Sequence, residues 1–361
     1  MIIFKGEKIM VNFELIGKFK AIKESDKFSS YETKLFDSGW ENVRYRFNVI
    51  SGTNRIMCEI SGGKWQDDSK NKIYAMSRAT SDKKSEKIII DWGKRNDPET
   101  IAKVAGWRIY TMGLTTESGD NHNFLDRTDY AEFVKGIIDG GEYKDTKFKI
   151  MGTVDYQYSA KDGRYYSTMS VNKIYRVNDD TPDKAEMTID AYYTEDAFNM
   201  ESYEDKGRCY FSCYTDYYFS NIKARKFVPL TLVIKKESDT DNRAKKFQKR
   251  LDVFEDEEVR KVSFLCKIIN GSEVEPITMD DLTPEQREDI EDGLTTLEDI
   301  QKAYGGGKMG DYSTEYRIVK CAKDSTTHGS ESTIYTIDNL KELPVVNVNA
   351  NDNEDIFDEE I

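Results

Sequence analysis

The chain has 361 residues, of which 38% are hydrophobic and 33% are charged, and its formal net charge is −14. This length allows two or three domains, each large enough to bury a core of its own. No run of about 18 apolar residues occurs and the N-terminus lacks the apolar core of a signal peptide, so the sequence predicts neither a membrane-spanning helix nor a secretion signal.

Cysteine and histidine are scarce. The five cysteines are scattered and odd in number, which is typical of a reducing compartment, and we expect a cytoplasmic protein. Two histidines in the whole chain argue against histidine-based metal sites and histidine acid–base chemistry. We expect no metal and no cofactor.

The first hundred residues are rich in strand patterns. Residues 11–23 alternate with a period of about two, which predicts a strand. Residues 43–50 alternate more clearly, with one face made by Val43, Tyr45, Phe47 and Val49 and the other by Arg44, Arg46 and Asn48. A turn at 51–54 and a return strand at 55–60 complete a hairpin. Shorter strands are expected at 72–76 and 87–92, followed by a short helix that starts at Asp97 and Pro98.

A short amphipathic helix at 129–138, closed by two glycines, precedes a second strand-rich block. This block opens with strands at 147–158 and 164–177 that are joined by a turn. Further strands are expected at 187–193, 208–219 and 227–235. Because both blocks run for about 100 residues and open with a strand and a tyrosine-bearing hairpin, we interpret them as a degenerate structural repeat.

The C-terminal third is less regular. Residues 262–269 predict a strand, and Thr283, Pro284 and Gln286 predict a helix start with a capping box. One or two strands are expected within 312–337. From residue 343 onward the pattern is lost and the chain becomes polar and acidic, which is typical of disorder.

Motifs of catalysis are missing from the sequence. The run Gly305-Gly306-Gly307-Lys308 is followed by Met309, and it lacks the Ser or Thr that a phosphate-binding loop requires. Cys209 and Cys213 would lie about 13 Å apart on a strand, too far to share one zinc ion, so we expect them in the core. We therefore do not expect an enzyme, unless carboxylates converge only in the fold.

The charge is unevenly distributed. Residues 1–110 carry 21 Lys and Arg against 15 Asp and Glu, whereas residues 251–350 carry 10 against 22. This asymmetry predicts a mildly basic body for binding and an acidic C-terminal part, although an excess of six positive charges over 110 residues is also unremarkable for an ordinary domain.

Aromatic and basic side chains alternate along both strand-rich blocks. The first block supplies Trp40, Arg44, Arg46, Lys64, Trp65, Lys72, Tyr74, Trp92, Lys94 and Arg95. The second block supplies Tyr156, Tyr158, Arg164, Tyr165, Tyr166, Lys173, Tyr175 and Arg176. Cations that neutralise phosphates beside rings on which bases stack are what binding of single-stranded nucleic acid requires.

Each of these aromatic residues has a structural alternative, since aromatic side chains in β-proteins mostly fill cores. Trp65 is the exception, because it follows Lys64 in a polar segment that begins with glycine. Tyr210, Tyr214 and Tyr218 alternate with the Cys209 and Cys213 face and are also expected outside the core.

The last eleven residues carry six acidic side chains and no basic ones, with apolar residues among them. Such a segment can dock on a partner through Asp355, Ile356, Phe357, Asp358 and Ile361, and its carboxylates can compete with phosphates for the chain's own binding surface. The alternative is an acidic end that only increases solubility.

Together, the basic aromatic β-body and the acidic, partly apolar C-terminus resemble single-stranded-DNA-binding proteins. The segment 12–19 followed by the hairpin 43–60 resembles the first strands of an OB barrel, and the paired blocks resemble the tandem OB folds of replication protein A. The style of the sequence is similar to versions from large bacteriophages. The tail departs from the bacterial family because it lacks a terminal Pro-Phe dipeptide.

We therefore predict a mainly β protein with tandem OB-like five-stranded barrels, a small C-terminal α+β segment and a disordered acidic tail. The expected boundaries are 1–127 for the first barrel, 128–142 for a linking helix, 143–250 for the second barrel, 251–342 for the α+β segment and 343–361 for the tail. The resemblance implies coating of single-stranded DNA in replication or recombination, with partner proteins recruited by the tail and no membrane contact. The alternative is a β-rich phage structural or assembly protein that makes protein contacts.

Overall fold

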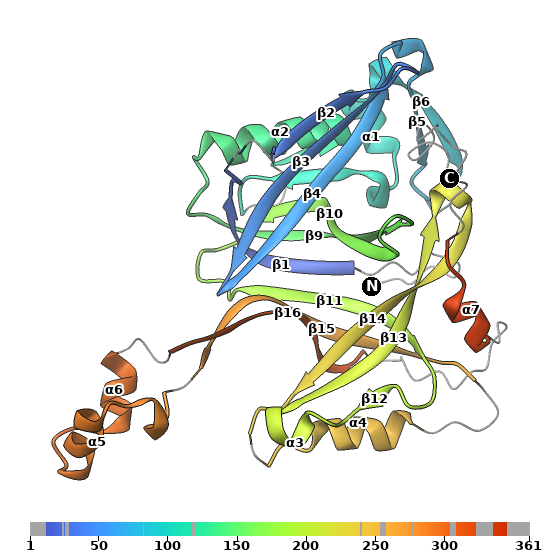
Figure 1. The fold of residues 1–361 in the computed structure, drawn as a ribbon. Coiled ribbons are helices and arrows are strands. Elements are labelled where there is room, and N and C mark those ends of the chain that lie inside the picture. The colour runs from blue at the N-terminus through green and yellow to red at the C-terminus, as the bar shows by residue number, and fades with distance from the viewer. Residues whose placement is uncertain are drawn as a thin grey trace.

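The computed structural model describes residues 12–23, 25, 29–81, 83–116, 120–238, 240–252, 258–275, 277–303, 308–322 and 335–344. Most of its strands join one sheet of 14 strands that closes on itself twice. Figure 1 shows the two resulting barrels one above the other.

The first barrel has five strands, namely β1 (Asn12–Lys20), β3 (Trp40–Ser51), β4 (Asn54–Trp65), β9 (Lys147–Ser159) and β10 (Arg164–Arg176). They pair in the order β1–β3–β4–β10–β9 and back to β1. Only the contact of β4 with β10 is parallel. The helix α2 (Arg127–Gly140) stands between the third and fourth of these strands in the sequence and packs on β3 and β4. A Greek-key barrel with this order is an OB fold.

The second barrel repeats the arrangement. Its strands are β11 (Lys184–Tyr193), β13 (Arg208–Phe219), β14 (Ala224–Lys235), β15 (Arg260–Glu275) and β16 (Lys308–Cys321). The pairing order is β11–β13–β14–β16–β15 and back to β11, and the third and fifth strands are again parallel. The helix α4 (Arg243–Leu251) again stands between the third and fourth strands.

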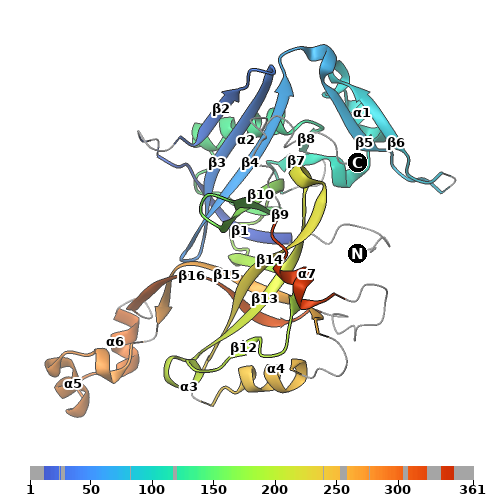
Figure 2. The ribbon, with the colours of Figure 1, turned by 45° about the vertical axis from the view of Figure 1, so that its right-hand side comes forward.

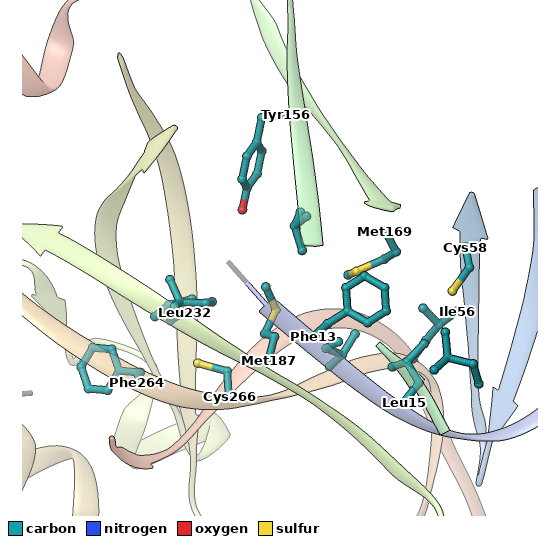
Figure 3. Close-up of a cluster of buried hydrophobic side chains, with 14 of the residues drawn as sticks. Phe13, Leu15, Ile56, Cys58, Tyr156, Met169, Met187, Leu232, Phe264 and Cys266 are labelled. Carbon is teal, nitrogen blue, oxygen red and sulfur yellow. The ribbon is translucent and has the colours of Figure 1, made fainter. Parts of the chain in front are cut away.

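The two barrels are joined through β1. Along its first half this strand pairs with β9 on one side and with β11 on the other. Its side chains Phe13 and Leu15 are buried, and Figure 3 places them between Ile56 of the first barrel and Met187 of the second. One continuous apolar cluster therefore fills both barrels.

A long insertion separates β4 from α2. Its elements are η1 (Asp68–Lys70), β5 (Lys72–Met76), β6 (Lys87–Asp91), η2 (Trp92–Lys94), α1 (Pro98–Lys103), η3 (Gly106–Arg108), β7 (Tyr110–Gly113) and β8 (Asn121–Phe124). The hairpin β5–β6 forms a sheet of its own with a separate small core around Ala75 and Ile90, whereas β7 and β8 extend the main sheet beside β10. Figure 2 shows the hairpin standing away from the first barrel next to β7 and β8.

Short elements complete the chain. They are β2 (Tyr31–Leu35), β12 (Phe198–Asn199), α3 (Tyr203–Lys206), η4 (Ser220–Ile222), η5 (Met279–Asp281), α5 (Pro284–Glu291), α6 (Leu297–Ala303) and α7 (Ile337–Lys341). The helices α5 and α6 lie at the end of the long β15–β16 ribbon, where Ile277, Leu282 and Ile300 form a small core (Figure 1). In the described ranges, no helix combines the length and apolarity needed to cross a membrane.

The predicted mainly β fold with tandem OB-like barrels is confirmed. The alternation predicted for 43–50 is confirmed as well, because Val43, Tyr45, Phe47 and Val49 are buried and both arginines point outward. The helix signals at Pro98, at residue 129 and at Pro284 each fall within a helix.

The strand pairing divides the chain differently from the boundaries expected for the barrels. The hairpin β9–β10 closes the first barrel instead of opening the second, because β9 pairs with β1 and β10 pairs with β4. The expected linking helix at 128–142 packs on the first barrel as α2. The expected α+β segment at 251–342 supplies β15 and β16, the fourth and fifth strands of the second barrel. Of the predicted tail, residues 345–361 lie outside the described residues.

Candidate nucleic-acid interface

OB folds bind oligonucleotides on the outer face of their second and third strands and through the loops that follow the first and fourth strands. In the first barrel this face belongs to β3 and β4, and in the second it belongs to β13 and β14. The residues predicted from the sequence can be placed against these surfaces.

Two predicted cations on β3 are already neutralised. Arg46 Nε donates to Glu59 Oε2 at 3.0 Å, and its Nη1 lies 3.1 Å from Glu32 Oε1. Arg44 Nε lies 3.3 Å from Glu59 Oε1. The two arginines and the two glutamates form a network without net charge, so this face attracts phosphates less than its arginines alone would.

The two tryptophans at the end of this face pack on each other. The rings of Trp40 and Trp65 meet edge to face with centroids 5.3 Å apart. Trp40 is only 8% exposed, so the prediction that it stacks on a base is wrong. Its ring lies over Gly63, where a Cβ would come within 2.2 Å of the indole. Trp65 is half-buried, and Lys70 Nζ lies over its ring, 5.4 Å from the centroid. Lys64 is half-buried beside it.

The turn between β9 and β10 carries several predicted tyrosines. Tyr158 and Tyr165 contact each other at 4.9 Å, and Tyr165 also packs on Phe219 of the second barrel at 6.3 Å. These two rings therefore join the barrels. Tyr166, at 52% exposure, and Arg164 remain on the surface of this turn.

The prediction for Tyr156 is wrong. Its ring is 4% exposed and packs edge to face against Tyr217 at 5.3 Å. Figure 3 shows it within the buried cluster. Its position on β9 of the first barrel, facing β13 of the second barrel, makes it a core residue rather than a stacking platform.

The insertion carries five of the predicted residues. Lys72 and Lys94 are exposed, and Tyr74 is 44% exposed on the outer face of β5. Arg95 stacks on Trp92 at 4.3 Å and donates from Nε to Asp129 Oδ2 at 2.7 Å, which ties the insertion to α2. The Arg95 guanidinium is therefore engaged within the protein, by Trp92 and Asp129, in this conformation.

One exposed tryptophan in the insertion was not predicted. Trp107 is 59% exposed, and the Arg108 guanidinium lies 4.2 Å from its ring. Burial of Arg108 lowers the pKa of its guanidinium. Like Gly63-Lys64-Trp65, the run Gly106-Trp107-Arg108 combines a glycine, a tryptophan and a basic residue. The pattern that singled out Trp65 could therefore also have identified Trp107.

A cavity of about 600 Å³ lies between the insertion and the edge of the main sheet. Lys173 and Tyr175 of β10 line it together with Thr111 of β7 and Asn121 and Asn123 of β8. A second cavity of about 450 Å³ follows at the end of β10 and is lined by Arg176, Thr115 and Thr116. Lys173, Tyr175 and Arg176, the last three residues predicted in the second block, therefore line two neighbouring cavities.

The outer face of the second barrel is rich in tyrosine and partly covered. Tyr210, Tyr214 and Tyr218 are half-buried on the outside of β13. Next to them, Tyr335, which precedes α7, packs on Phe227 at 5.0 Å. Lys226 Nζ lies 2.6 Å from Glu342 Oε1, which fastens the other end of α7. The predicted partner-binding residues of the tail lie outside the described residues.

The strand orders define a protein built from two OB barrels within one sheet. No model of a known protein family matches the chain, and no curated protein matches it. Among solved structures, the wild-type single-stranded DNA binding protein from Thermus aquaticus is similar with 8% identity and a TM-score of 0.36, over 90% of this chain and 96% of that one. A deletion variant of the same protein is similar with 9% identity and a TM-score of 0.33, over 76% of this chain and 98% of that one.

Proposed function

We propose that this protein binds single-stranded DNA without sequence preference. The observation that carries the proposal is the twofold occurrence of the OB strand order, with aromatic and basic side chains on the outer surface of both barrels. OB barrels hold single strands by stacking bases on aromatic rings and by placing cations along the backbone. Exposed Trp107, Tyr74 and Tyr166 supply the rings. Lys72 on the strand of Tyr74, Arg164 on the strand of Tyr166 and Lys94 elsewhere in the insertion supply the cations.

The role in the cell follows from the same binding. A protein that coats single strands would protect them in DNA replication or recombination, in the cytoplasm of the cell or of a phage-infected host. The acidic segment 351–361 would recruit partner proteins. In this role the protein needs no cofactor and performs no catalysis.

Fluorescence anisotropy of a labelled poly-dT oligonucleotide tests the proposal at low and high salt, with the full chain and with a chain that ends at Ala350. We expect tight binding that weakens with salt, because neutralised phosphates release counterions. The shortened chain is expected to bind equally well or better. Absence of binding to single strands at low salt by both chains would contradict the proposal and favour a structural or assembly protein.

A further inference from the structure

We propose that the cavity between the insertion and β10 holds one nucleotide of the bound strand, with its base against Tyr175 and a phosphate at Lys173. This inference rests on the proposed function and extends the interface of the first barrel beyond its second and third strands. The fifth strand, lengthened by β7 and β8, would then form a binding wall of its own.

The wall is built from two rows of register partners. Lys173 lies beside Thr111, and Thr111 lies beside Asn123. In the next row Tyr175 lies beside Gly113, and Gly113 lies beside Asn121.

Because alternate residues of a strand share a face, both rows point into the same cavity. On the opposite face, Met112 and Ile174 are buried in the barrel core. The barrel core therefore lies directly behind the wall.

Gly113 opens the centre of this wall. A Cβ there would lie 2.5 Å from Asn121 Oδ1 and 3.4 Å from Tyr175 Cδ1. The missing side chain lets the amide and the ring approach each other across β7. An aromatic face next to an amide suits a nucleobase, which stacks on one and forms hydrogen bonds with the other.

The polar groups of the cavity are available for a ligand. Asn123 Oδ1 accepts a hydrogen bond from Thr111 Oγ1 at 3.0 Å, which leaves the Asn123 amide nitrogen to donate elsewhere. Within the described part of the chain, Lys173 is half-buried and has no carboxylate at ion-pair distance.

The opposite wall adds a second cation, Arg78, which is exposed and whose Nε donates to the carbonyl of Val104. None of the described lining residues is acidic. Two cations without a carboxylate favour an anion such as phosphate.

The volume fits the same ligand class. About 600 Å³ lies within the usual range of small-molecule sites, which is roughly 300–1,000 Å³. Apolar side chains from α1 and from the segment after it, such as Ile101 and Ile109, complete the opposite wall and can cover the exposed face of a base.

Photocrosslinking of the full chain to an oligo-dT that carries one 5-iodouracil locates the bases directly. We expect a crosslinked peptide from β10 that contains Tyr175. Crosslinks confined to peptides of β3, β4, β13 and β14 would overturn the inference while leaving DNA binding intact.

Anisotropy with three variants provides the second test. Replacement Tyr175→Leu is expected to weaken oligo-dT binding about tenfold because it removes one stacked base, whereas Tyr175→Phe keeps the ring and the affinity. Replacement Lys173→Gln is expected to weaken binding and reduce the salt dependence by about one phosphate contact. Matched controls are Tyr312→Leu, at an exposed tyrosine of β16, and Lys144→Gln, at an exposed lysine before β9.

The outcomes separate the two proposals. If the wild-type chain binds no single strand, the proposed function fails. If the wild-type chain binds and both Tyr175→Leu and Lys173→Gln match it, only the nucleotide cavity is overturned.

Discussion

Arg46 and Glu59 face each other across β3 and β4, with Nε of one 3.0 Å from Oε2 of the other. The pair lies on the surface where an OB barrel contacts a single strand, and both side chains are largely buried by their neighbours. Glu59 also forms an ion pair with Arg44, so one carboxylate offsets the charge of two arginines.

Replacement Glu59→Gln should therefore release positive charge on this face. We expect oligo-dT affinity to rise a few-fold at low salt and the salt dependence to become steeper by about one phosphate contact, because the arginines gain access to the backbone. Anisotropy titrations over a series of salt concentrations measure both quantities.

Replacement Glu41→Gln, on the same pair of strands, removes an equal charge from a residue whose register partner is Lys64 rather than either arginine. An equal gain in affinity for both variants would mean that only the net charge matters.

Asp126 makes stability depend on pH. It caps α2 by accepting hydrogen bonds from the backbone N–H groups of Thr128 and Asp129. Burial, aided by the charge of Asp129, raises the pKa of the Asp126 carboxyl to about 6. Because this pKa is above that of Asp in the unfolded chain, the folded state binds the proton more tightly. Proton binding therefore stabilises the fold at low pH, and this stabilisation is lost as pH rises from about 4 to about 6.

The variant Asp126→Asn keeps an acceptor at the cap and cannot titrate. We expect the wild-type chain to lose free energy of unfolding relative to this variant between about pH 4 and pH 6, and the difference to stay constant above about pH 7. Urea unfolding at several pH values measures it. Parallel stability curves for the two chains would show that Asp126 does not carry the proton.

Two glycines should respond oppositely to alanine. Gly136 lies inside α2 with open space where the methyl group of an alanine would lie, so Gly136→Ala should stabilise the fold by about 1 kcal/mol. Gly152 of β9 pairs with Val171 of β10 beside a register shift, and a Cβ there would be 1.9 Å from Ser170 O. Gly152→Ala should destabilise the fold by about 3 kcal/mol. Urea unfolding midpoints test the pair, and a change of the same sign in both would contradict the packing of the first barrel.

The segment around α7 should compete with DNA for the second barrel. A chain that ends at Pro344 lacks only the acidic tail, whereas a chain that ends before Tyr335 also uncovers Phe227 and Tyr192. We expect the first truncation to raise affinity for oligo-dT mainly at low salt, because it removes negative charge. The second should add a gain that persists at high salt, because it exposes aromatic surface. Identical affinities of the two shortened chains at high salt would show that DNA does not use this face.

The sequence alone determined most of the strands of the two barrels. Alternation at 43–50 fixed which side chains of β3 are buried, because successive residues of a strand face opposite sides. The capping residues Asp97, Pro98 and Thr283 fixed two helix starts, because they satisfy backbone N–H groups locally. These features depend on neighbours within a few residues.

The tertiary structure alone decided which strands share a barrel and which side chains are available to a ligand. The hairpin β9–β10 pairs with β1 across more than 120 residues, and the patterns of both blocks allow either partner. Burial separated Tyr156 from Tyr166, although both are tyrosines on long strands of the same hairpin. Ion pairs occupied Arg44 and Arg46, while Lys173 was left facing a cavity that four separate segments build. Long-range pairing sets these contacts, and periodicity along a single strand carries no information about the strand that will lie beside it.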